Sequence, residues 1–239
     1  MRNGQVVHVI LYGGRGGGKH QKGSDVELGH LCRGIVSGRA QSEGLIRGKD
    51  FEAVWSHQNI RHDYKLYSLL CFFLEVIAKL APQASWEEEI PNEFESGEMA
   101  GFFRVLSNAL VYLDTPRGEA AANLADQLAL FVSKLMLELG IFPLLERCVL
   151  SGTVLTSQTS MGLLSEKGGF ADSKLIAVGR SGLSHTPLRQ FLIQVRETRY
   201  PDFVFSGPLE HALVKNLVDY FLFHVHLHPF DFKTLSLVI

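Results

Sequence analysis

The stretch that divides this chain into two kinds of structure runs from Leu66 to Leu80 and reads LYSLLCFFLEVIAKL. Its large apolar side chains recur at intervals of three and four residues, a period that predicts one long amphipathic helix. Pro82 follows, and helices normally end before a proline. Because the run is short and is interrupted by Glu75 and Lys79, we do not expect it to cross a membrane.

The sequence before this helix has the pattern of β-structure. Three β-leaning segments, Val6–Tyr12, Val26–Val36 and Leu45–Trp55, are separated by glycine-containing stretches at 13–23 and 37–44. Short segments of this kind, bounded by glycine turns, are typical of strands. We therefore expect a small, strongly bent sheet or a partial barrel.

The sequence after it is dominated by helical patterns. One further helix is expected to end near Leu139, and the apolar spacing across 102–113 predicts a buried helix face. Residues 151–184 are rich in glycine and serine and have no sustained period, which indicates irregular structure. Four helix starts are indicated by capping residues or by proline at the first helical position. They are Ser96 with Glu98, Thr115-Pro116, Thr186-Pro187, and Gly207-Pro208 with Glu210.

These patterns predict an α+β protein of two parts. Residues 1–57 would form the β-domain. Residues 58–239 would form a mainly helical domain with an irregular subdomain at about 146–184.

The composition is that of a folded cytoplasmic protein. Of the 239 residues, 46% are apolar, enough for a sizeable core. Cys32, Cys71 and Cys148 are odd in number and far apart, which favours free thiols in a reducing compartment. The first residues lack the apolar run of a signal peptide, so we expect a soluble protein of the cytoplasm.

The charge is distributed unevenly along the chain. Residues 1–49 hold eight Lys and Arg against three Asp and Glu, whereas residues 82–120 hold two against eight. This asymmetry indicates that the N-terminal part faces polyanions, although an uneven surface charge without function gives the same count.

The glycine-rich segment Gly13–Gly23 allows three interpretations. Gly13 to Lys19 matches the G-x-x-x-x-G-K of a nucleotide-phosphate loop, but His20 stands where a hydroxyl should bind magnesium. Asp114, the candidate acidic partner, falls at the end of the helical run described above. The second interpretation is a basic loop that contacts a nucleic-acid backbone, and the third is a connection without a further role.

Several short motifs, taken in order, resemble the bacterial recombination mediator RecO. After the basic-loop β-domain come HDYKLY at 62–67, which opens a helix, and GIFPLLERC at 140–148. The closing segments YFLFH at 220–224 and PFDFKTL at 229–235 are also similar to that family. Each motif is short, and the resemblance rests on their shared order over residues 6–239.

The resemblance implies an N-terminal OB-fold barrel, a mainly α-helical C-terminal domain and no enzymatic activity. It implies a role in DNA repair and homologous recombination, in which the protein binds single- and double-stranded DNA and anneals complementary strands. The implied partners are RecR, single-strand-binding protein and, indirectly, RecA, in the bacterial cytoplasm near the nucleoid. No cofactor is implied.

Two departures from the family pattern change these expectations. In the family two further strands normally precede the one expected at Val6–Tyr12, so the barrel would be incomplete. Its open edges would be explained by a shortened start, by cover from the C-terminal tail or by dimer contacts. Many relatives also carry a four-cysteine zinc site, of which only Cys148 is present. Ser151, Asp172 and Leu175 occupy the other positions, so the subdomain should fold without metal.

The candidate DNA-binding residues are cations of the N-terminal part. Such side chains would contact phosphates from the loop and from the sheet, without sequence specificity and with strong salt dependence. Tyr12, Phe51 and Trp55 are candidates for base stacking, but packing is the favoured role for each. The cations are Arg15, Lys19, Lys22, Arg33, Arg39, Arg47 and Lys49.

The tail offers a second metal pattern, His224, His226 and His228. Alternate residues share a face only in a strand, and a helix over 208–227 would separate these side chains. Histidines that serve the end of a helix are therefore favoured over a metal site.

Two other functional classes stay open. One is a nucleotide-dependent phosphotransferase that uses Lys19, although no catalytic triad or second nucleotide motif accompanies it. The other is an adaptor that has lost DNA binding and holds protein partners in apolar grooves of the helical domain.

Overall fold

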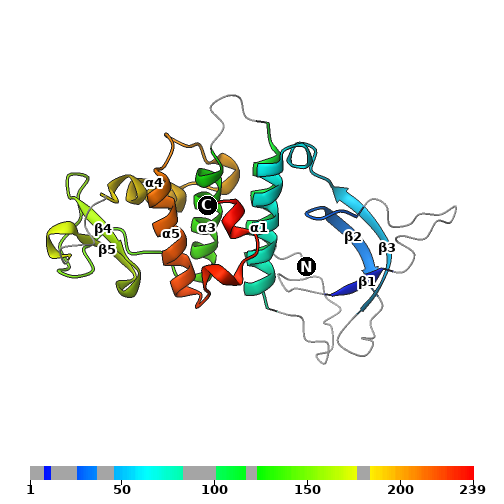
Figure 1. Ribbon diagram of the computed structural model, residues 1–239, viewed down its shortest axis with the longest axis horizontal. Helices are drawn as coiled ribbons and strands as arrows, with labels where there is room; N and C mark the ends of the chain where they lie inside the picture. The colour runs from blue at the N-terminus through cyan, green and yellow to red at the C-terminus, as the bar shows by residue number, and fades with distance from the viewer. Residues whose placement is uncertain (1–7, 12–25, 37–45, 83–100, 117–122, 177–183) are drawn as a thin grey trace.

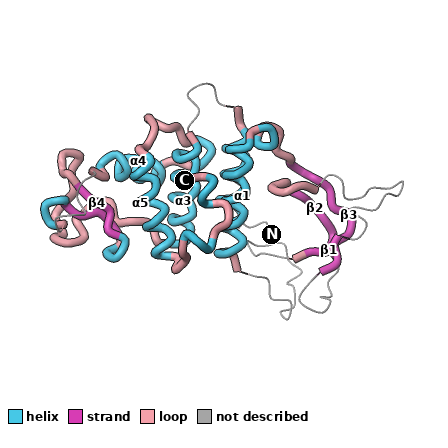
Figure 2. Tube along the Cα trace, viewed as in Figure 1, coloured by secondary structure: helices cyan, strands magenta, loops and turns pink. Residues whose placement is uncertain are grey.

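The computed structural model describes residues 8–11, 26–36, 46–82, 101–116, 123–176 and 184–239. Its three parts lie in a row, with a curved sheet at one end, a group of helices in the middle and a small hairpin at the other end (Figure 1). The tube in Figure 2 shows that strands and helices occupy separate regions. The predicted α+β class is confirmed.

The N-terminal sheet has three strands in the order β1-β3-β2. They are β1 (Val9–Leu11), β2 (Leu31–Val36) and β3 (Ile46–Trp55). β1 runs parallel to β3, and β2 runs antiparallel to it. The three predicted strands are confirmed with shorter bounds.

The strand predicted over Val26–Val36 begins five residues late because its first part is a turn. Gly29 has φ +81°, a left-handed conformation that favours glycine. A Cβ atom at this position would also lie 2.7 Å from Cδ1 of Leu70, so the turn packs closely on a helix.

Five α-helices follow in the described part of the chain. They are α1 (Tyr64–Leu80), α2 (Gly101–Asp114), α3 (Leu124–Leu139), α4 (Thr186–Glu197) and α5 (His211–His224). α3 contacts the other four helices and is the centre of the group (Figure 1). Its apolar residues from Leu128 to Val132 are completely buried.

Capping residues explain where these helices begin and end. The Asp63 carboxylate accepts hydrogen bonds from the backbone N–H groups of Lys65 and Leu66 at the start of α1. Asn123 caps α3, and the left-handed Gly140 ends it at the predicted place.

The predicted helix starts differ in accuracy. Thr186-Pro187 is confirmed, with the proline in the first turn of α4. Thr115 and Pro116 are not helical, and α3 begins only at Leu124. Pro208 precedes α5, and Glu210 occupies the N-cap position without a hydrogen bond from its side chain. Ser96 lies outside the described residues.

The stretch expected to be irregular contains a hairpin. β4 (Met161–Leu164) and β5 (Gly169–Asp172) pair antiparallel, joined by a short 3-10 turn. No period is visible in the sequence because each strand is only four residues long.

The C-terminal tail packs on α1. The ring of Phe232 lies 5.5 Å from that of Phe72. The Glu75 carboxylate accepts hydrogen bonds from the backbone N–H groups of Lys233 and Thr234 and from the Thr234 hydroxyl. The described contacts of the tail are therefore with a helix, and they give no support to cover by the tail as the explanation for an open barrel.

None of the helices in the described part of the chain has both the length and the apolar character that a membrane-spanning segment needs. Cys32, Cys71 and Cys148 are all free thiols, and Cys71 is half-buried against the core.

Candidate nucleic-acid interface

The register of β2 and β3 determines which side chains share a face of the sheet. Arg33 pairs with Glu52, and Ile35 pairs with Lys49, so three residues of β2 (33–35) stand opposite four residues of β3 (49–52). This bulge bends β3 at its middle. Arg33, Ile35 and Glu52 are exposed, whereas Phe51 is half-buried.

The opposite face of the sheet is used for packing. A Cβ atom on Gly34 would lie 2.7 Å from the Phe51 ring, so this ring covers the glycine. Trp55 packs against the core of the helical domain. These contacts fit the packing role that the sequence favours for Phe51 and Trp55, and Tyr12 lies outside the described residues.

The structure describes the side chains of two of the seven predicted cations. Arg33 on β2 and Arg47 on β3 are both exposed, and Arg47 pairs with Ile10 of β1. Lys49 belongs to β3, but its side chain is outside the described part. The remaining four, Arg15, Lys19, Lys22 and Arg39, lie outside the described residues.

Glu52 is a residue that sequence reasoning did not weigh. It is exposed directly opposite Arg33, so a carboxylate accompanies one of the two described cations. Opposite charges across strands attract each other and lower the local positive potential. The face is therefore less basic than the cation count of residues 1–49 suggests.

An exposed tyrosine also escaped the sequence analysis. Tyr64 is the first residue of α1, and 72% of its surface is exposed. Tyr64 directly follows the Asp63 cap and precedes the first buried residue of the helix. This position is the signal from which its exposure could have been predicted.

The structure describes the context of the glycine-rich segment only from residue 26 onward. A phosphate loop is followed directly by a helix whose N–H groups complete the phosphate site. Residues 26–30 form a turn and extended chain, and residues 31–36 are a strand. The loop itself and residues 20–25, where such a helix would begin, lie outside the described residues.

Asp114, the candidate acidic partner of that loop, serves a different purpose. It ends α2, and its Oδ1 accepts hydrogen bonds from the N–H groups of Asn59 at 2.7 Å and of Gln58 and Ile60 at 3.0 Å. Burial raises the pKa of Asp114, but these three hydrogen bonds outweigh it, so its pKa lies below the ordinary value. This carboxylate fixes the short 3-10 turn η1 (Ile60–His62), which leads into α1.

Cys148, Ser151 and Asp172, three of the four positions that the resemblance assigns to zinc ligands, lie in contact. The N–H of Asp172 donates to Sγ of the buried Cys148 over 3.4 Å. Burial raises the pKa of Cys148, but hydrogen bonds from the Ser151 hydroxyl and from backbone N–H groups outweigh it and lower the pKa. The Cys148 thiol is thus held by hydrogen bonds from Ser151 and Asp172.

The three tail histidines have separate environments. α5 ends at His224, and His226 has φ +56°. The His228 side chain accepts a hydrogen bond from the N–H of Phe230 at the start of the 3-10 turn η5 (Pro229–Asp231). In the described part of the chain they do not form a group of converging ligand atoms.

The helical domain has a hollow of about 540 Å³ between α2, α3 and the end of α4. Its cations already have partners: Arg104 pairs with Glu138 at 2.9 Å, and the Lys134 ammonium donates to the Val195 carbonyl at 2.6 Å. Burial lowers the pKa of Lys134. Arg104 is thus paired with a carboxylate, whereas Lys134 is held by a neutral carbonyl oxygen.

Comparison with known proteins adds no relative. The chain matches no protein-family model, no curated protein and no solved structure.

Proposed function

We propose that this protein is a nucleic-acid-binding mediator of homologous recombination, of the RecO type. The observation that carries the proposal is the order of the N-terminal sheet, β1-β3-β2, with a parallel and an antiparallel pair, followed by a helical domain. In a five-stranded OB-fold, the fifth strand lies between the third, which is parallel to it, and the fourth, which is antiparallel. β1, β2 and β3 have the order and directions of those last three strands.

This correspondence supports both the fold and the expected surface. OB-folds bind oligonucleotides through the face of the second and third strands and through two loops, one of which connects the fourth and fifth strands. The segment in the equivalent position here is 37–45, which contains Arg39. Arg33 and Arg47 are exposed on the two strands that this segment connects.

The distal subdomain is compatible with the proposal. The resemblance assigns zinc ligands to the positions of Cys148, Ser151, Asp172 and Leu175. Cys148 is in contact with Ser151 and Asp172.

The proposed action is electrostatic and makes or breaks no bond. Cations of residues 1–49 neutralise phosphates of single- and double-stranded DNA, and the counterions released drive binding. Neutralised strands repel each other less, which favours annealing of complementary strands. RecR and single-strand-binding protein are the proposed partners, and loading of RecA is the proposed outcome.

A thermal-shift experiment tests the proposal against its enzymatic alternative. A ligand that binds only the folded state raises the melting temperature. We expect a rise with a single-stranded oligonucleotide at low salt and none with Mg-ATP. A rise with Mg-ATP and none with the oligonucleotide would support the phosphotransferase instead.

An annealing assay completes the test. The protein should accelerate the pairing of two complementary oligonucleotides at low salt, and high salt should abolish the effect. Binding to a peptide partner without any effect on oligonucleotides would favour the adaptor and reject DNA binding.

A further inference from the structure

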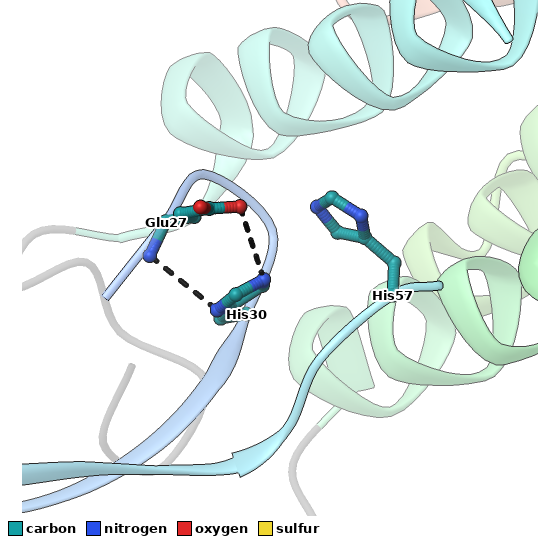
Figure 3. A group of neighbouring side chains, drawn as sticks. All are labelled: Glu27, His30 and His57. Atoms are coloured by element: carbon teal, nitrogen blue, oxygen red, sulfur yellow. Dashed lines mark hydrogen bonds and ion pairs between the residues drawn. The ribbon is translucent and has the colours of Figure 1, made fainter. Parts of the chain in front are cut away.

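Three possible metal ligands converge where the sheet meets α1. Glu27 and His30 come from the turn before β2, and His57 follows β3 (Figure 3). One ligand atom of each lies within 4.8 Å of the other two. His30 Nε2 lies 3.6 Å from Glu27 Oε2, and His57 Nε2 lies 3.0 Å from the carbonyl oxygen of Leu28. Figure 3 shows the Glu27 carboxylate and both rings directed toward a common space.

The burial of the three side chains differs in a way that suits a metal site. The side chain of His30 is 4% exposed and His57 is 1% exposed, whereas the Glu27 side chain is 53% exposed. Two imidazoles are therefore held in place by packing, with their rings 4.9 Å apart. The carboxylate leaves an approach from solvent.

The cluster already attracts a cation of the chain itself. Nη2 of Arg61 lies 3.3 Å from Glu27 Oε2 and 3.5 Å from His30 Nε2. The Arg61 Nε also donates to the His57 carbonyl at 3.1 Å, so the guanidinium belongs to the junction. A metal ion and Arg61 would compete for the same carboxylate.

The hydrogen bonds of His57 assign its proton. Since Leu28 contributes a carbonyl, His57 Nε2 is the donor in this contact. His57 Nδ1 is buried and has no hydrogen-bond partner among the described residues. A ligand at Nε2 would move the proton to Nδ1 and leave the Leu28 carbonyl available as a further oxygen donor.

We propose that Glu27, His30 and His57 form a binding site for one divalent transition metal ion, with Zn²⁺ as the best match. Two imidazole nitrogens and one carboxylate are a donor set that Zn²⁺ accepts, whereas Mg²⁺ and Ca²⁺ prefer oxygen. The Leu28 carbonyl or a water molecule completes the coordination, and Arg61 withdraws. The ion would join the turn before β2 to the segment that leads into α1. This inference goes beyond the proposed DNA binding and does not depend on it.

Trp55 gives a local probe, because its ring lies 6.5 Å from that of His57. Trp86 is the second tryptophan of the chain, so a Trp86→Phe background isolates the signal. Co²⁺ should quench Trp55 with one equivalent bound and give the visible absorption of a low-coordinate cobalt site, and Zn²⁺ should displace it.

Variants assign the ligands. Glu27→Gln and His57→Gln should each weaken Co²⁺ binding by at least about tenfold. The Glu27 substitution is less able to disturb folding than the His57 substitution, because the exposed Glu27 side chain is not part of the core. Arg61→Gln should tighten binding, since it removes the competing cation. His62→Gln, at an exposed neighbouring position, and the double variant His226→Gln/His228→Gln should leave binding unchanged.

The inference is overturned if no saturable binding of one ion occurs, if binding survives in Glu27→Gln and His57→Gln, or if it is lost in the tail variant. Weaker binding in Arg61→Gln would also contradict it. Circular dichroism of each variant confirms that the fold is retained. DNA binding is measured separately, so failure of either proposal is recognised independently.

Discussion

The N-terminal sheet and the helical domain are stabilised by different kinds of contact. All the fully buried apolar side chains of the described residues lie at or after Ile60, and α3 is surrounded by four helices. Among the residues of β1, β2 and β3 whose exposure is described, none is fully buried. The helical domain therefore has its own core, whereas the sheet keeps both a packing face and an exposed face that can hold a ligand.

The junction between these regions is polar. The Leu28 carbonyl contacts His57, Arg61 pairs with Glu27, and Asp114 accepts three backbone hydrogen bonds from the segment between β3 and α1. Such contacts fix geometry with little apolar burial. Changes in the core, at the junction and on the sheet should accordingly have effects of decreasing size on stability.

The largest effect is expected from Phe131→Ala in α3. Phe131 is completely buried, and its ring is stacked on Phe73 with centroids 3.8 Å apart. Loss of a buried phenylalanine costs about 3–5 kcal/mol, so urea unfolding should show a decrease of that size. Phe51→Ala on the half-buried face of the sheet should cost about 1 kcal/mol. Equal losses would contradict the difference between the two regions.

A smaller effect is expected from Asp114→Asn at the junction. Replacing the charged acceptor of three N–H groups should cost about 2 kcal/mol. The pKa of Asp114 is lowered, so its contribution is complete above the ordinary value of 3.8 and is lost as the pH falls through the folded value. Unfolding measured at pH 7 and pH 3 should show a smaller difference between variant and parent at the lower pH. A constant difference would show that the carboxylate charge is not involved.

His185 should make the helical side of the molecule sensitive to acid. Its buried Nδ1 accepts the N–H of Leu163 at 2.8 Å, and burial lowers its pKa. The unfolded state then binds more protons as the pH falls below the ordinary value of 6.5, so this stabilisation is present above that value and is lost below it. His185→Gln should cost about 1 kcal/mol at pH 7.5 and flatten the decline in melting temperature between pH 7 and pH 5. If the melting temperature of the variant declines as steeply as that of the parent, groups other than His185 cause the sensitivity to acid.

The helical part of the fold was well predicted from the sequence because its signals are local and strong. The apolar period of Leu66–Leu80 and the end near Leu139 correspond to α1 and to the left-handed Gly140. The helix starts predicted at Pro116 and Pro208 were wrong because proline begins turns as readily as helices. The β4–β5 hairpin was missed because four-residue strands carry too little pattern to be recognised.

The site was less predictable, because its geometry depends on pairing between distant segments. No sequence pattern shows that Glu52 stands opposite Arg33, since the bulge in β3 shifts the register. The meeting of His57 with His30 also depends on how the turn packs on α1. Conversely, Asp114 was dismissed as a magnesium ligand for the right reason, its position on a helix, but its contacts with η1 could be seen only in the structure.

Replacing Arg33 and Arg47 on the sheet should have the smallest effect on stability and the largest effect on DNA binding. The effect on DNA binding tests the central claim most directly. The measurement is the salt dependence of single-stranded DNA binding, followed by fluorescence anisotropy, for the parent, for Arg33→Gln/Arg47→Gln and for Arg199→Gln. Each phosphate contact contributes about 0.7 to the slope of log affinity against log salt, so the double variant should lose about 1.4. The matched control Arg199, with 86% of its side chain exposed on the helical domain, should leave the slope unchanged. A parent that does not bind DNA, or equal slopes for all three proteins, would contradict the assignment of nucleic-acid binding to the sheet.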